Sequence, residues 1–168
     1  MALFRSIATV GSWTMVSRVL GFVRDMLIAN VIGAGLIADA FFVAFKFPNF
    51  FRRLFAEGAF NAAFVPLFAG RLTTDGKTAA VEFAAEVASV LCAALLVFTI
   101  AAILTMPWLM LAIAPGFTDQ PDKFDLTVSL TQLTFPYLTF MALVALMGGM
   151  LNSLERFAAT AAAPILLN

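Results

Sequence analysis

The chain has 168 residues with ten basic and ten acidic side chains, so its formal net charge is zero. Hydrophobic residues make up 62% of it and charged residues only 12%, with a mean hydropathy of +1.00, which predicts an integral membrane protein and gives no sign of nucleic-acid binding. Because there is no histidine and a single cysteine, Cys92, we expect no disulfide, no metal site, no cofactor and no histidine-based catalysis.

Five hydrophobic segments follow one another and are expected to be helices. They cover residues 7–32, 38–70, 79–113, 124–154 and a stretch that begins near 157. The third and fourth contain uncharged runs longer than the roughly 20 residues that a spanning helix needs. A membrane β-barrel would instead show alternating segments of about ten residues. The predicted fold class is therefore an all-α integral membrane protein, a transmembrane helix bundle.

Short connectors rich in turn residues separate these segments and favour antiparallel neighbours. They also indicate an orientation, because basic residues gather in the cytoplasmic loops of membrane proteins. Arg5, Arg71, Lys77 and Arg156 would lie on the side of the amino terminus, and only Lys123 on the other. We therefore expect the amino terminus to be cytoplasmic.

The first segment carries a polar stripe within an arc of about 140° at helical spacing. Its members are Gly11, Thr14, Ser17, Arg18, Gly21, Arg24 and Asp25. A charge near the bilayer centre costs at least roughly 2.5 to 3.5 kcal/mol, so this face is expected to line a wet cavity. Two arginines with one aspartate suit a phosphate or pyrophosphate. In the alternative interpretation, Asp25 pairs with an arginine and the stripe only holds helices together.

The second segment has a polar face that would form if its helix were regular. That face contains Asp39, Lys46, Asn49, Arg53, Glu57 and Asn61. Pro48, followed by Gly58 and Pro66, predicts a bent or partly unwound stretch over 47–58. Broken helices at membrane depth often form transporter sites. The pattern does not decide whether Arg52 or Arg53 faces inward, and Arg53 could instead reach the lipid headgroups from the interface.

These residues resemble a known family, the MurJ (MviN) lipid II flippases. The resemblance rests on TMVSRVLGFVRD at 14–25, GAG at 33–35, DAFFVAFKFPN at 39–49, RRLFAEGAF at 52–60 and AFVP at 63–66, with APGF at 114–117 and FPY at 135–137. It implies a two-lobe transporter of the multidrug/oligosaccharidyl-lipid/polysaccharide superfamily in the bacterial cytoplasmic (inner) membrane. Such a transporter moves the lipid-linked peptidoglycan precursor, lipid II, to the periplasmic leaflet by alternating access.

The resemblance also implies roles for individual residues. Arg18, Arg24 and Arg52 would line a cationic cavity and bind the pyrophosphate–sugar headgroup. Supporting or gating roles would fall to Ser17, Asp25, Asp39, Arg53 and Glu57, and Asp25 or Asp39 would pair with the arginines once the substrate has left. The fifth segment stops at Asn168 after about a dozen residues, too few to cross a membrane.

We therefore expect an amino-terminal lobe fragment, covering residues 1–168, of a larger transporter. Its partners would be lipid II, membrane lipids and the carboxy-terminal part, without which it would be inactive. One alternative is an exporter of another polyprenyl-linked saccharide, and another is a membrane protein that only binds partners. An enzyme acting on polyprenyl phosphates would need a nucleophile with a base or an acidic metal cluster, and the acids here are interleaved with arginines.

Overall fold

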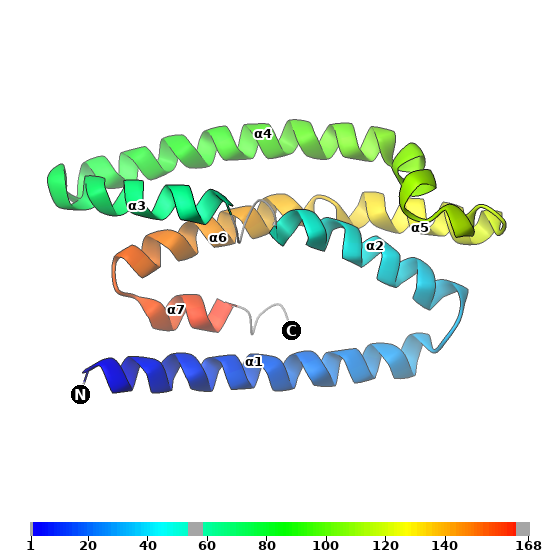
Figure 1. Ribbon diagram of the computed structural model, residues 1–168, viewed down its shortest axis with the longest axis horizontal. Helices are drawn as coiled ribbons and strands as arrows, with labels where there is room; N and C mark the ends of the chain where they lie inside the picture. Colours follow the sequence, from blue (N-terminus) through cyan, green and yellow to red (C-terminus); the bar gives the residue numbers. More distant parts are fainter. Residues whose placement is uncertain (1, 54–58, 164–168) are drawn as a thin grey trace.

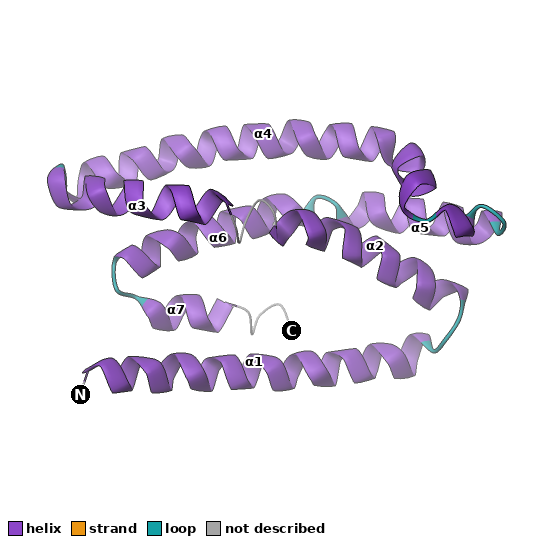
Figure 2. Cartoon of the chain, viewed as in Figure 1, coloured by secondary structure: helices purple, strands orange, loops and turns teal. Residues whose placement is uncertain are grey.

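The computed structural model describes residues 2–53 and 59–163, so Glu57 lies outside the described residues. Within these ranges every regular element is a helix (Figure 2), which confirms the all-α fold class. The elements are α1 (Ala2–Ile32), α2 (Leu36–Arg52), α3 (Ala59–Thr74), α4 (Gly76–Ile113), the short 3-10 helix η2 (Pro115–Phe117), α5 (Pro121–Thr134), α6 (Tyr137–Ser153) and α7 (Phe157–Ala162).

The helices run back and forth along one direction (Figure 1). After α1, the chain returns through α2 and α3, reverses into the long α4, returns again through α5 and α6, and turns back into α7. Two stretches of the described chain, Gly76–Ile113 and Pro121–Ser153, are long and apolar enough to cross a membrane. Helices suit that setting because they satisfy their own backbone hydrogen bonds.

Glycine makes the reversals at two of the turns. Gly33 has φ 69° directly after α1 and donates its N–H to the carbonyl of Ala29 at 3.0 Å, a common way for a helix to end. Gly76, with φ 83°, begins α4 after the turn that follows α3. A side chain is disfavoured at such positive φ values, so these glycines let consecutive helices lie antiparallel.

The core consists of two apolar clusters on either side of the centre of the bundle. The first joins α2, α4, α5 and α6 around Met106, Phe135 and Leu138, which are fully buried. The second joins α3, α4 and α6 around Phe68 and Ala80. By contrast, α1 touches mainly α7 and α2. The helix with the polar stripe therefore lies at the edge of the packed bundle (Figure 1).

Of the bent or partly unwound stretch predicted over 47–58, residues 47–52 are not unwound. Pro48 is buried inside α2, and the helix continues through it to Arg52. The rest of that stretch, 54–58, lies outside the described residues. Proline removes one backbone donor without necessarily ending a helix, provided that the carbonyl it frees finds another donor. That donor comes from α5, as described below.

Candidate functional site

One face of α1 is turned toward the rest of the chain. Between Val10 and Ile32, the least exposed residues are Ser17, Gly21, Arg24, Ile28 and Ile32. Their spacing of three or four residues is that of one helix face. Ser17 is only 8% exposed. Ser17 and Arg24 of the polar stripe thus point inward, whereas Arg18 lies at its exposed edge.

Arg24 is held by its neighbour in the sequence. Its Nε and Nη2 atoms donate to Oδ1 of Asp25 at 3.1 and 2.9 Å. The two side chains are 36% and 68% exposed, so the ion pair contributes less than about 1 kcal/mol. Because both residues belong to α1, this pair does not join two helices. The interpretation of the stripe as a link between helices therefore gains no support from it.

Arg52 and Arg53 lie in different surroundings on α2. The Arg52 Nε atom donates to Oδ1 of Asn49 at 2.8 Å, and its side chain is half-buried. An amide oxygen orients the guanidinium without neutralising its charge. Arg53 is exposed and lines a polar recess of about 240 Å³ with Lys46, Asn49 and Phe50.

The basic residues of α1 and α2 lie at similar distances along the chain from the turn that joins the two helices. The two helices run in opposite directions from the turn at 33–35 (Figure 1). At 1.5 Å per residue, Arg18 and Arg52 lie roughly 22 and 25 Å along their helices from this turn. Arg24 and Lys46 lie roughly 14 and 16 Å from it. Counted along the chain, these basic residues thus form two pairs at similar distances from the turn, on helices that diverge from it (Figure 1).

The sequence predicted that Lys46 lies on the polar face of the second segment, but it did not identify Lys46 as a residue that binds the headgroup. The signal that could have identified it is its distance from the turn, which matches that of Arg24. Residues 10–53 hold five basic side chains and two acidic ones. This excess of positive charge favours an anion over a metal ion.

Asp39 pairs with a lysine far away in the sequence. The Lys123 Nζ atom lies 2.6 Å from Oδ2 of Asp39 and 4.1 Å from the ring centre of Phe117. This contact joins the first turn of α2 to the first turn of α5. The structure thus gives Asp39 a cation partner from α5, whereas the sequence offered Asp25 or Asp39 as a partner of the arginines once the substrate has left. Spacing alone could not reveal a partner 84 residues away.

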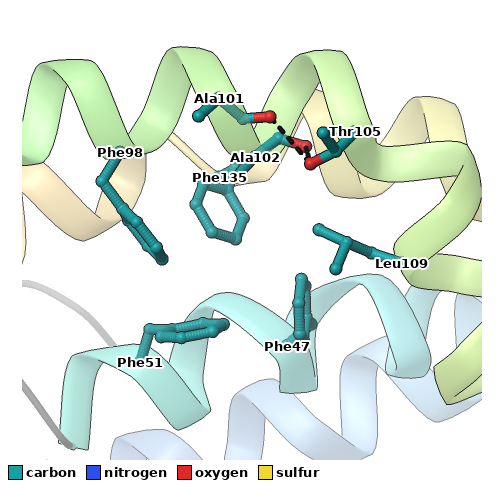
Figure 3. Close-up of a pocket in the computed structure, with 8 residues that line it drawn as sticks. All are labelled: Phe47, Phe51, Phe98, Ala101, Ala102, Thr105, Leu109 and Phe135. Carbon is teal, nitrogen blue, oxygen red and sulfur yellow. Dashed lines mark hydrogen bonds between the residues drawn. The ribbon is translucent and has the colours of Figure 1, made fainter.

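A cavity on another side of α2 has a different character (Figure 3). It measures about 200 Å³ and is lined by Phe47, Phe51, Phe98, Ala101, Ala102, Thr105, Leu109 and Phe135. Its hydroxyl, from Thr105, donates to the carbonyl of Ala101 at 2.8 Å. A site for an anion needs donors or positive charge, so this aromatic cavity is separate from the cationic face.

Comparison with known proteins assigns the chain to a family. The family model described as "Lipid II flippase MurJ" matches residues 28–168. A "Probable lipid II flippase MurJ" of Rhizobium tropici is 54% identical over the whole chain, and one of Rhizobium meliloti is 52% identical; the chain covers 32% of each. A "Lipid II flippase MurJ" of Burkholderia cenocepacia is 42% identical over the whole chain, which covers 33% of it.

The chain thus spans about a third of the length of the curated relatives it matches. The region matched by the family model includes α2 with Lys46, Asn49 and Arg52. The alignment with the Rhizobium tropici relative covers the whole chain and therefore α1 as well. The helical fold and its apolar segments agree with this assignment. The chain belongs to the lipid II flippase MurJ family of membrane proteins.

Proposed function

We propose that this chain is part of a lipid II flippase and that α1 and α2 supply the cationic half of its headgroup site. The observation that carries the proposal is that Arg18 and Arg52, and likewise Arg24 and Lys46, lie at similar distances from the turn at 33–35, on consecutive helices that run in opposite directions. Charges at membrane depth usually mark a substrate pathway. The remainder of the site would come from the part of the transporter that lies beyond this chain.

The pyrophosphate of lipid II fits these side chains chemically. A guanidinium keeps its charge and presents a planar fork that bonds two phosphate oxygens at once. Arg24 would exchange the carboxylate of Asp25 for the pyrophosphate when the substrate arrives and take it back on release. Arg52, oriented by the amide oxygen of Asn49, would direct its guanidinium to the pyrophosphate. Ser17 lies on the same inward face as Arg24 and would support it.

The transport cycle would be alternating access in the bacterial cytoplasmic membrane. The cavity would receive the headgroup from the cytoplasmic leaflet and release it to the periplasmic leaflet while the polyprenyl tail stays in lipid. The amino terminus would be cytoplasmic, since four basic connector residues fall on that side and one on the other. No bond of the substrate is made or broken, so the protein would be a transporter rather than an enzyme.

A complementation experiment tests the proposal. The full-length protein would be produced in bacteria depleted of their own lipid II flippase, with Arg24→Ala or Arg52→Ala, and lipid II in the outer leaflet would be measured. Losing one charge-assisted hydrogen bond should lower export about 10- to 100-fold. Arg156→Ala, exposed in the turn before α7, is the matched control and should export normally.

Two results would change the proposal in different ways. Normal export by both Arg24→Ala and Arg52→Ala, at equal protein levels, would contradict the cationic site. If the unaltered protein fails to restore export, yet binds another polyprenyl-pyrophosphate-linked saccharide through Arg24, the anion site stands and the assignment to lipid II falls.

A further inference from the structure

Three prolines lie inside the described helices, Pro48 in α2, Pro66 in α3 and Pro107 in α4, and each leaves a carbonyl group without its usual donor. Two of these carbonyls, those freed by Pro48 and Pro107, receive a side-chain donor from another helix. In an α-helix the N–H of each residue donates to the carbonyl four residues earlier, and proline has no N–H. Pro48 in α2 therefore frees the carbonyl of Ala44, and Pro107 in α4 frees that of Ile103. An unsatisfied carbonyl in an apolar setting is costly, so a replacement donor is expected for each.

Both replacement donors come from α5. Gln132 Nε2 donates to the carbonyl of Ile103 at 2.9 Å. Thr134 Oγ1 lies 3.3 Å from the carbonyl of Ala44. Gln132 and Thr134 are two positions apart in the helix, so their side chains project from α5 in directions about 200° apart. One helix can therefore donate hydrogen bonds to neighbouring helices on two sides. Helix α5 packs against both α2 and α4.

The two contacts differ in strength. Gln132 is half-buried and uses a terminal amide that has two hydrogens to donate. Thr134 has one hydroxyl hydrogen, and that hydrogen is shared with the carbonyls of Leu130 at 2.9 Å and Thr131 at 3.2 Å. The Gln132 contact is therefore the stronger replacement, and the Thr134 contact is the weaker second case of the same arrangement.

We propose that Gln132 and Thr134 supply the hydrogen-bond donors that the proline-interrupted backbones of α4 and α2 lack. In α2 the completed turn comes just before Asn49, whose side chain orients Arg52. A polar side chain of α5 thus holds the helix that carries a cation of the proposed site. This role concerns the backbone, and it holds whatever molecule the protein transports.

A double-substitution experiment tests the role of Gln132. Gln132→Leu removes the donor and keeps the approximate volume, and Pro107→Ala restores the N–H that Ile103 lacks. The intact protein would be purified in detergent and its thermal unfolding measured. Gln132→Leu should lower Tm by roughly 2 to 4 °C in the wild-type background. In the Pro107→Ala background it should change Tm by less than about 1 °C, because the carbonyl is then satisfied within α4.

Pro66→Ala provides the matched control. Pro66 lies inside α3, and replacing it restores no donor to Ile103, so Gln132→Leu should keep its full effect on Tm there. An equal loss of Tm in the wild-type and Pro107→Ala backgrounds would overturn the proposal. If Gln132→Leu alone fails to accumulate in the membrane, accumulation serves as the readout. Recovery with Pro107→Ala supports the proposal, and no recovery, when Pro107→Ala itself accumulates, contradicts it.

Discussion

Arg24 and Arg52 donate hydrogen bonds to different kinds of oxygen. A carboxylate holds Arg24, and an incoming anion must compete with that charge. A neutral amide holds Arg52 and fixes its direction while leaving the positive charge in place. Arg24 thus has a carboxylate among its partners and Arg52 an amide, and in the proposed site an incoming pyrophosphate would compete with Asp25 for Arg24.

The ion pair between Asp39 and Lys123 should stabilise the contact between α2 and α5 by a small, measurable amount. The carboxylate is 57% exposed, which weakens its attraction to Lys123. A double-mutant cycle with Asp39→Asn and Lys123→Met should give a coupling energy of about 0.5 to 1 kcal/mol in thermal unfolding. Asp119→Asn, at an exposed position in the turn before α5, should show no coupling with Lys123→Met. Additive effects of Asp39→Asn and Lys123→Met would show that the pair contributes nothing.

The sequence could predict some of these residues because their signal is local. Helical spacing places Ser17 and Arg24 on one face, and the structure turns that face inward. The partner of Asp39 depends on how α5 meets α2, which no spacing within α2 encodes. The different surroundings of Arg52 and Arg53 could not be predicted either, since they depend on whether α2 stays helical through Pro48.

At the scale of elements, α6 approaches α3 at one glycine of a pair. A Cβ atom added to Gly149 would lie 3.1 Å from Cγ2 of Val65 and 3.3 Å from Oδ1 of Asn61. At Gly148 the nearest atom, Cγ2 of Thr160, would lie 3.6 Å away, an ordinary contact. Because Val65 is β-branched and stiff at χ1, it has little freedom to move aside.

Alanine substitutions at these neighbouring positions should therefore have opposite effects. Gly149→Ala should lower the free energy of unfolding by about 1 to 3 kcal/mol through overpacking. Gly148→Ala should raise it by roughly 0.5 to 1 kcal/mol, because alanine is the better helix former. Chemical or thermal unfolding of the two variants checks the difference. Equal unfolding free energies of Gly149→Ala and Gly148→Ala would contradict this prediction, because they would show that α3 and α6 can move apart to make room for the added methyl group.

Helix α5 is rich in hydroxyl side chains although it belongs to a stretch long enough to cross a membrane. Thr127 and Thr131 are fully buried, and their hydroxyls donate to carbonyls one turn earlier, those of Lys123 at 2.7 Å and Thr127 at 2.6 Å. Their polarity is thus satisfied within the helix. The uncharged run predicted that this segment spans the membrane. The hydrogen bonds that α5 donates to the carbonyls freed by Pro48 and Pro107 depend on how the helices pack, and no sequence pattern predicted them.

At the scale of the whole molecule, α1 exposes large apolar side chains on most of its circumference. Phe22 is 65% exposed, Met15 67% and Val31 80%. Such a surface needs lipid or protein to cover it. The relatives are about three times as long as this chain, so the proposed remainder of the transporter could cover part of it. Hydropathy predicted the long apolar segments, but it could not predict that α1 makes few contacts with the other helices of this chain.

The proposed binding of the lipid II pyrophosphate by the cations of α1 and α2 is tested most directly by measuring lipid II binding to the purified full-length protein. With Arg24→Ala and Arg52→Ala combined, the Kd for lipid II should rise at least about 100-fold, while Arg156→Ala leaves it unchanged. Undecaprenol, which lacks the pyrophosphate, should bind equally weakly to all three proteins. An unchanged Kd for lipid II in the double variant would contradict the account.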